Sequence, residues 1–198
     1  MSLIPIVSKA FCAPTQTALT IRKRPRVVNG GGFVVLNPQQ NVVFSVHGCG
    51  ILGVNGELVV KDGGGASILF IRKKGGLVQA LSACSERWRG YLMEFGRPNK
   101  PLFSLRDPKS CFAMKSAIRI SVDRKDYSNG WDFEVKGCFL EKNCTINDRR
   151  GNIVAKVGVK VKASEDLYHV NVQPGYDQAF VIGVIAVLDN IYGESTRC

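Results

Sequence analysis

Residues 179–188 read Ala-Phe-Val-Ile-Gly-Val-Ile-Ala-Val-Leu, an uninterrupted run of ten apolar residues close to the end of the chain. Asp177 precedes the run in the position of a helix N-cap, and Gly193 follows it as a helix stop. The many β-branched residues also permit a buried strand, but the run exceeds the usual strand length of about four to eight residues. We therefore predict a helix that is apolar on every face, and such a helix is buried either in protein or in a membrane.

The length of the run decides between these two environments. Ten residues at ~1.5 Å each make about 15 Å of helix, whereas the hydrocarbon core of a bilayer is about 30 Å thick. Acidic residues also flank the run, at Asp177 and Asp189. We predict that the helix lies in the protein's own core. Because a helix with side chains is ~10–12 Å wide, a barrel around it needs more than about eight strands.

The rest of the chain alternates apolar and polar residues between turn sequences, as antiparallel strands do. In the clearest stretch, the residues predicted to face the core are Ile153, Ala155, Val157, Val159 and Val161. An Asp-led turn between two apolar runs occurs twice, at Asp62 and at Asp148. The chain has room for about eleven or twelve short strands. The predicted fold class is therefore mainly β, a barrel of antiparallel strands around a central C-terminal helix.

The domain organisation follows from the same patterns. Residues 1–18 contain Pro5 and Pro14 and little periodicity, so we predict an extended leader, followed by one barrel domain over 19–198 with its helix near 176–190. The N-terminus shows no signal-peptide pattern, and the seven Cys are scattered without a CxxC pair. We expect a cytoplasmic monomer with reduced thiols. Cys12 could carry a palmitoyl group, although a buried or free thiol is the simpler expectation.

Catalysis and metal binding find little support in the sequence. The two histidines, His47 and His169, lie in strand-like stretches without a nucleophile motif, and we predict that the protein is not an enzyme and holds no cofactor or metal. One acidic stretch invites comparison with a calcium loop, and its residues are Asp123, Asp126, Asn129, Asp132 and Glu134. Only the first and last of these match the EF-hand spacing, which favours a solvated turn.

The net charge of +11 is the main functional signal, because it favours nucleic acid, anionic lipid or phosphorylated partners. The excess is uneven, since no acidic residue precedes Glu57. The simpler alternative is a basic surface that only keeps the protein soluble. Nucleic acid is the less favoured partner, because aromatic residues are not interleaved with the basic runs and no nucleic-acid motif occurs.

Several short segments occur in a particular order between residues 5 and 192. They are Gly32-Phe33-Val34-Val35, Val43-Phe44-Ser45-Val46-His47-Gly48, Leu69-Phe70-Ile71-Arg72-Lys73-Lys74, Trp131-Asp132-Phe133-Glu134-Val135-Lys136-Gly137, Asp148 with Gly151 and Val154-Ala155, and Tyr176-Asp177 with its apolar helix. Together they resemble the LURP-one-related proteins of plants, a family similar to tubby C-terminal domains and phospholipid scramblases. The resemblance implies a barrel of twelve strands threaded by a C-terminal helix, a relation to scramblases and membrane-tethered tubby-like transcription factors, and a setting in plant defence.

The resemblance also implies a ligand, because tubby-like domains hold phosphoinositide headgroups with basic side chains on barrel strands. The candidate residues for binding an anionic lipid headgroup are Arg22, Lys23, Arg24, Arg72, Lys73, Lys74, Lys156, Lys160 and Lys162. Scramblase activity itself is not expected, since neither a calcium loop nor a spanning helix is predicted. The alternatives are a protein-interaction scaffold without a small ligand and a nonspecific nucleic-acid binder. We expect a cytoplasmic protein that is peripheral at the plasma membrane, with nuclear entry left open.

Overall fold

The computed structural model describes residues 4–24, 31–48, 56–74, 87–106, 118–123, 130–159, 167–193 and residue 196. These residues form a short 3-10 turn, twelve strands and one helix. In chain order they are η1 (Lys9–Phe11), β1 (Thr17–Lys23), β2 (Gly32–Leu36), β3 (Val42–His47), β4 (Glu57–Asp62), β5 (Ser67–Lys74), β6 (Arg87–Glu94), β7 (Arg97–Arg106), β8 (Ile118–Val122), β9 (Phe133–Cys138), β10 (Asn143–Asp148), β11 (Ile153–Gly158), β12 (Leu167–Val172) and α1 (Gln178–Tyr192).

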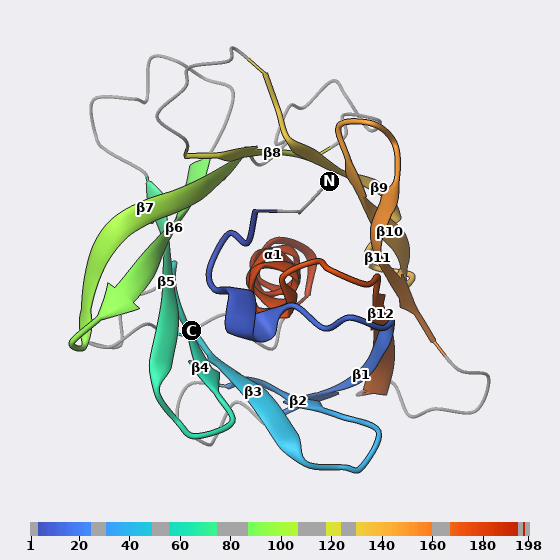
Figure 1. Ribbon diagram of the computed structural model, residues 1–198, viewed down its shortest axis with the longest axis horizontal. Helices are drawn as coiled ribbons and strands as arrows, with labels where there is room; N and C mark the ends of the chain where they lie inside the picture. The colour runs from blue at the N-terminus through green and yellow to red at the C-terminus, as the bar shows by residue number, and fades with distance from the viewer. Residues whose placement is uncertain are drawn as a thin grey trace.

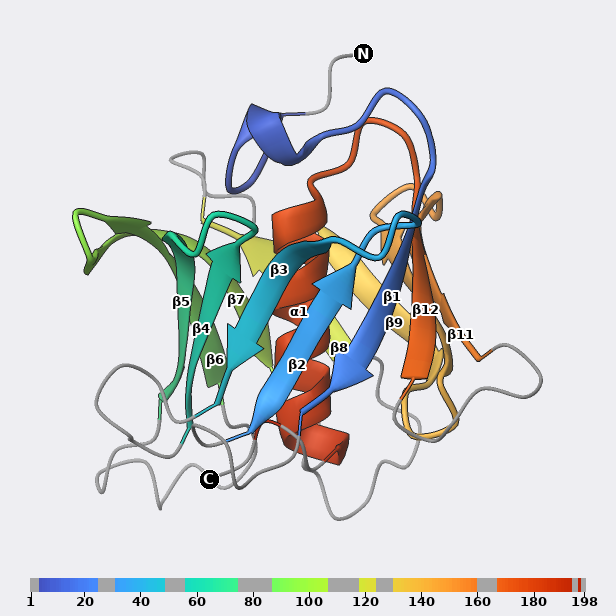
Figure 2. The ribbon, with the colours of Figure 1, turned by 90° about the horizontal axis from the view of Figure 1, so that it is seen from below.

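The strands form a closed antiparallel barrel in which each strand pairs with its neighbours in sequence. Closure comes from β1 and β12, which pair from Thr17 opposite Val172 to Arg22 opposite Leu167. In a closed barrel every strand has a neighbour on each side. Because the strands alternate in direction, all odd-numbered strands end at the same end of the barrel, which we call the lower end (Figure 2).

Helix α1 runs along the barrel axis and fills its interior (Figure 1). All residues from Ala179 to Asp189 are buried, and Asp177 caps the helix by accepting a hydrogen bond from the Phe180 N–H at 3.2 Å. The Phe180 ring packs edge-on against Phe103, with ring centroids 5.3 Å apart. The prediction of a buried helix inside a wide barrel of about twelve strands is therefore confirmed.

The helix continues past the apolar run to Tyr192, close to the predicted range of 176–190. Asp189, which the sequence places as an acidic flank of that run, is fully buried inside the helix. The carboxylate tolerates burial because its Oδ2 accepts hydrogen bonds from the Thr196 N–H at 3.0 Å and the Thr196 hydroxyl at 3.1 Å. The predicted stop at Gly193 is correct, since this residue is the C-cap.

The predicted core face of β11 is also partly wrong. Val154 and Ala155 are both buried, whereas Ile153 is 46% exposed and Val159 is 51% exposed. The pairing with β10 shifts at this point, because Ile146 faces Ala155 and the next residue of β10 faces Ile153. Val154 is thus the extra residue of a β-bulge, which turns the strand by one residue and moves Ile153 away from the core. Val161 lies outside the described residues.

The repeated Asp-led turn has a structural counterpart. At Asp62 the side-chain Oδ1 accepts the N–H of Ala66 at 2.9 Å, and at Asp148 it accepts the N–H of Asn152 at 2.8 Å. In both turns the glycine before the residue that donates this hydrogen bond has a positive φ, 85° at Gly65 and 87° at Gly151. Two hairpins of the barrel therefore use the same turn chemistry, which an Asp side chain and a glycine specify locally.

The N-terminal segment covers the upper end of the barrel (Figure 2). The backbone N–H groups of Val7 and Ser8 donate to Asp177 Oδ2 at 2.7 and 3.0 Å, and the Phe11 ring packs on Phe44 at a centroid distance of 5.5 Å. Asp177 thus holds the helix and the leader together. β1 begins at Thr17, two residues before the predicted start of the barrel.

Candidate anion-binding surface

Five cationic side chains share the outer face of β5, β6 and β7 at the lower end of the barrel. They form what we call the basic face: Arg72, Lys74, Arg87, Arg89 and Arg106. Their outward direction follows from strand alternation, since the intervening Trp88 and Leu105 are buried in the core. These five residues form one surface because each of them lies on the face of its strand opposite the core residues.

Strand pairing aligns these cations in two lateral rows. Lys74 lies opposite Arg87, and Arg87 lies opposite Arg106, so one row crosses three strands. In the adjacent outward row, Arg72 lies opposite Arg89. Directly opposed residues have Cβ atoms ~4.5–5.5 Å apart, a separation at which like charges destabilise the strand pair. A multivalent anion bound across the rows would remove this repulsion.

The described neighbours of the basic face compensate only part of its charge. The guanidinium carbon of Arg72 lies 5.2 Å from the centre of the Tyr91 ring, an arrangement that leaves its N–H groups available. Arg89 has a carboxylate nearby, with its Nη2 3.9 Å from Asp123 Oδ2. Glu57 lies opposite Arg72 on β4. Within the described part of the chain, the row of Lys74, Arg87 and Arg106 makes no ion pair with a carboxylate.

The chemistry of this arrangement suits phosphate. Arginine offers two parallel N–H groups that match a phosphate in bidentate geometry, and lysine adds a compact charge. Four arginines and one lysine on a nearly continuous strand surface can contact several phosphate groups at once.

The predicted run on β5 divides between two faces. Arg72 and Lys74 are exposed and belong to the basic face. Lys73 lies between them in sequence and is half-buried on the inner side, where its Cβ would be 3.2 Å from a Cβ added at Gly56. Alternation along one strand therefore removes Lys73 from the surface that its neighbours form.

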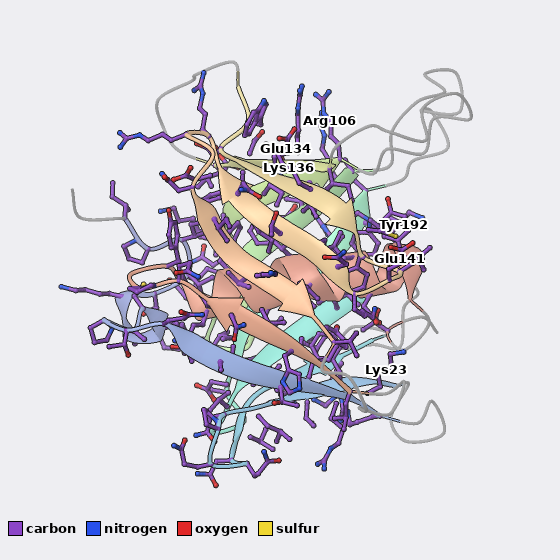
Figure 3. The ribbon with its side chains drawn as sticks, turned by 90° about the vertical axis from the view of Figure 1, so that its right-hand side faces the viewer. Lys23, Arg106, Glu134, Lys136, Glu141 and Tyr192 are labelled. Atoms are coloured by element: carbon purple, nitrogen blue, oxygen red, sulfur yellow. The ribbon has the colours of Figure 1, made fainter. Side chains whose placement is uncertain are left out.

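The predicted run on β1 lies at the lower end but on other strands. Arg22 is exposed on the outer side of β1, and Lys23 is half-buried at the rim. Figure 3 shows Lys23 on the far side of the lower end from Arg106. Arg24 donates from Nη2 to the carbonyl oxygens of Val46 at 2.7 Å and Gly31 at 3.4 Å. Burial lowers the pKa of Arg24, whose side chain joins the ends of β1, β2 and β3.

Of the third predicted run, Lys156 lies on β11, on the opposite side of the barrel from β6. Lys156 is exposed there between Thr145 and Asn171 of the adjacent strands. Lys160 and Lys162 lie outside the described residues. Of the seven predicted residues that the structure describes, two belong to the basic face, and the structure adds Arg87, Arg89 and Arg106, which sequence reasoning missed. The signal that could have found two of them is the spacing of Arg87 and Arg89, two residues apart on one strand.

A buried polar cluster lies inside the lower end of the barrel. Lys142 Nζ is 3.7 Å from the centre of the Phe139 ring and 4.7 Å from that of Tyr168. Burial lowers the pKa of Lys142, while Asp189 and two cysteine thiols act against this shift and Lys23 adds to it. Burial also raises the pKa of Tyr168 well above its usual range. These groups close the end of the core rather than face the basic surface.

The candidate catalytic and calcium residues are used within the fold. His47 Nε2 is 3.4 Å from the Ser45 hydroxyl, and His169 Nδ1 is 3.1 Å from the Thr20 hydroxyl. Burial lowers the pKa of His47 to about 4, with Arg24 adding to this effect.

In the acidic stretch, Asp132 Oδ2 accepts the N–H of Val122 at 2.7 Å, and Glu134 faces Arg119 and Lys136 at 3.7 and 3.5 Å. Asp126 and Asn129 lie outside the described residues. Where side chains are described, His, Cys, Asp and Glu do not gather in groups of three or more that could hold a metal ion.

Two further findings concern the thiols and the membrane. Cys12, Cys138 and Cys144 are free thiols, and the other four cysteines lie outside the described residues. Burial raises the pKa of Cys144 to about 11, which makes this thiol a poor nucleophile. In the described ranges, no helix is both long enough and apolar enough to cross a bilayer.

Comparison with known proteins gives a consistent result. A sequence model of the family described as LURP-one-related matches residues 17–189. Protein LURP-one-related 6 of Arabidopsis thaliana is 49% identical over 194 residues, which cover 98% of each chain. Protein LURP-one-related 16 of the same plant is 43% identical over 206 residues, covering 98% of this chain and 95% of that protein. An X-ray structure of a protein from Arabidopsis thaliana, 23% identical, matches the fold with a TM-score of 0.70 over 96% of this chain and 99% of that one.

Proposed function

Since this chain belongs to the LURP-one-related family, we propose that it is a non-enzymatic module that binds anionic phospholipid at the surface of a membrane. The observation that carries the proposal is the lateral row of Lys74, Arg87 and Arg106 on three adjacent strands. Arg72 and Arg89 extend the same surface by a second row. The packing of the core does not require cations at these positions. Their placement opposite one another therefore favours a phosphate-bearing ligand.

The expected strength follows from the number of cations. A Lys or Arg close to an anionic membrane contributes ~1 kcal/mol, so the row of three contributes about 3 kcal/mol and the two partly compensated arginines somewhat less. This is sufficient for reversible docking and too little for permanent anchoring. Because the attraction is between exposed charges, it must weaken as salt shortens the Debye length.

The proposal has three more specific parts. Phosphoinositide is the favoured headgroup, because several phosphate groups can bridge the two rows. The kinship to tubby-like domains and scramblases is proposed at the level of the barrel and of lipid recognition, without lipid transport. A role in plant defence, and a cytoplasmic location at the plasma membrane, complete the proposal.

Liposome flotation tests this function. We would compare neutral phosphatidylcholine vesicles with vesicles containing phosphatidylserine or a phosphoinositide, matched in total negative charge, over a salt titration. We expect retention on both anionic vesicles and stronger retention on phosphoinositide. Changing Lys74, Arg87 and Arg106 to Gln should reduce binding by on the order of a hundredfold, since ~1.4 kcal/mol corresponds to tenfold.

A matched control removes the same charge elsewhere. Changing Lys9, Arg22 and Lys156 to Gln keeps the basic face intact and should leave most of the binding. Equal losses in the two triple variants would show that the whole positive charge, rather than the basic face, attracts the vesicle. The absence of wild-type binding at low salt would refute the proposal. A salt-titrated oligonucleotide shift of both variants would show whether the same face prefers nucleic acid.

The basic-face variant also gives a stability readout. Because the row opposes like charges across β5, β6 and β7, its neutralisation should leave thermal stability unchanged or raise it. A loss of lipid binding that comes with a large loss of stability would instead indicate a structural role for these side chains.

A further inference from the structure

The β6–β7 hairpin ends in an aromatic side chain that no described part of the chain covers. Phe95 at its tip is 103% exposed, and Glu94, Gly96 and the first four residues of β7 are exposed as well. Figure 2 shows this hairpin standing away from the barrel at the upper left, beyond the upper end of the barrel where β5 begins. A single exposed hydrophobic residue is ordinary, but a fully exposed aromatic side chain at the tip of a projecting hairpin indicates a contact site for a binding partner.

The backbone makes the choice of residue more unusual. Glu94 pairs with Arg97, so Phe95 and Gly96 form a two-residue loop, and both have positive φ, 50° and 73°. This type I′ geometry suits Asn-Gly, whereas a bulky residue in the left-handed region is disfavoured. The sequence therefore places a large aromatic where folding gains nothing from it and the backbone resists it. Such a combination points to binding.

The surroundings of the tip favour a membrane over a protein pocket. Arg97 and Lys100 flank the phenylalanine on the exposed start of β7, and the Glu94 carboxylate accepts a hydrogen bond from Asn99. An apolar tip with cations just behind it matches the bilayer boundary, where acyl chains lie beneath phosphate groups.

The hairpin and the basic face are also parts of one ribbon. β6 runs for eight residues from Arg87 at the lower end to Glu94 at the tip, about 26 Å at the usual rise per residue. In Figures 1 and 2 the ribbon and its projecting tip lie on the same side of the barrel as β5. The basic face and Phe95 therefore lie at opposite ends of one ribbon.

We propose that Phe95 inserts into the interfacial region of an anionic bilayer while the basic face contacts headgroups, so that the barrel docks on the side of β5, β6 and β7. The inference rests on the proposed binding of anionic lipid. Insertion of Phe95 adds an apolar contribution to membrane binding that salt does not screen. It also defines the orientation of the barrel on the membrane. Electrostatic attraction brings the protein to the surface, and insertion of the aromatic ring prolongs its stay.

The test uses a substitution that should affect stability and binding in opposite directions. Phe95→Asn gives the loop its preferred residue, so the melting temperature should rise by roughly 2–4 °C. Partition to phosphatidylcholine vesicles containing phosphatidylserine should fall by about tenfold, and the loss should be most evident at high salt. The control is Leu140→Asn, an exposed apolar residue at the lower end of the barrel, which should leave partition unchanged.

A second measurement reports insertion directly. Phe95→Trp should gain fluorescence quenching by brominated acyl chains beyond that of the wild type, in which Trp88 is buried and Trp131 provides the background. Equal vesicle partition of wild type and Phe95→Asn, or no added quenching in Phe95→Trp, would overturn the insertion while leaving headgroup binding intact, and Phe95 would then dock on a protein. Failure of the wild type to bind any anionic vesicle would overturn both.

Discussion

The contact between α1 and β5 gives a prediction whose sign depends on atomic packing. A Cβ added at Gly183 would lie 2.5 Å from Leu69 Cδ2, 3.4 Å from Ile71 Cδ1 and 3.7 Å from Phe103 Cζ. In an exposed helix, Gly→Ala stabilises by about 1 kcal/mol because alanine is the better helix former. Here Leu69 is fully buried, so its methyl group cannot move into solvent. Overpacking of this kind costs ~1–3 kcal/mol. Gly183→Ala should therefore lower the free energy of unfolding by about 0–2 kcal/mol.

A double-mutant cycle separates the two effects. Leu69→Val removes the atom that the new methyl group would meet, at a cost of roughly 1 kcal/mol by itself. In that background Gly183→Ala should become stabilising by about 1 kcal/mol, because only the helix propensity remains. The coupling energy between the two positions should be ~1–3 kcal/mol. Urea unfolding followed by tryptophan fluorescence measures all four free energies, provided that the slope with denaturant stays constant.

The control uses a core deletion that does not touch Gly183. Ile120→Val on β8 removes one methylene from another part of the barrel and should leave the effect of Gly183→Ala unchanged. Stabilisation by Gly183→Ala in the wild-type background, or a coupling to Leu69 below about 0.5 kcal/mol, would show that the helix is not packed tightly on β5.

Three further predictions concern the core and its ends. Gly183→Asp would bring an unpaired charge into the barrel and should abolish soluble expression, and a soluble variant that unfolds cooperatively would contradict a central position of the helix. Asp177→Asn keeps a good N-cap but turns an amide NH₂ toward the N–H groups of Val7 and Ser8, so limited proteolysis should cut the leader faster with α1 intact. Burial lowers the pKa of His47 from 6.5 to about 4, so its neutral form is favoured in the folded state. The stability it contributes is fully present above pH 6.5 and is lost as the pH falls toward 4, and His47→Gln should flatten the melting temperature across that range.

Much of the barrel could be predicted because its determinants are local. The apolar run of α1, its cap at Asp177 and the turns at Asp62 and Asp148 each depend on residues that are close together in the sequence. The differences between the structure and the prediction have local geometric causes, which the alternation of apolar and polar residues does not reveal. The bulge at Val154 moves Ile153 off the core face of β11, and the partner of Asp189 comes from Thr196 beyond the end of the helix.

The candidate surface could not be predicted in the same way. The sequence identifies Arg72 and Lys74 as basic residues close together, and alternation alone would have separated Lys73 from them. Cations on β6 join Arg72 and Lys74 only if the pairing register places them opposite these two residues. That register is set when β5 and β6 pair. Arg22 on β1 and Lys156 on β11 belong to runs that are equally basic in the sequence, but these two residues lie on other sides of the barrel.

Periodicity and turn chemistry act within a few residues, so they alone specify strands with one apolar face and a central helix too short to span a bilayer. Which charges stand together is settled only in the folded barrel. It depends on how the strands pair, because the β5–β6 register sets Lys74 opposite Arg87 and the β6–β7 register sets Arg87 opposite Arg106. Charge rows are properties of neighbouring strands, so they exist only once the strands are placed side by side.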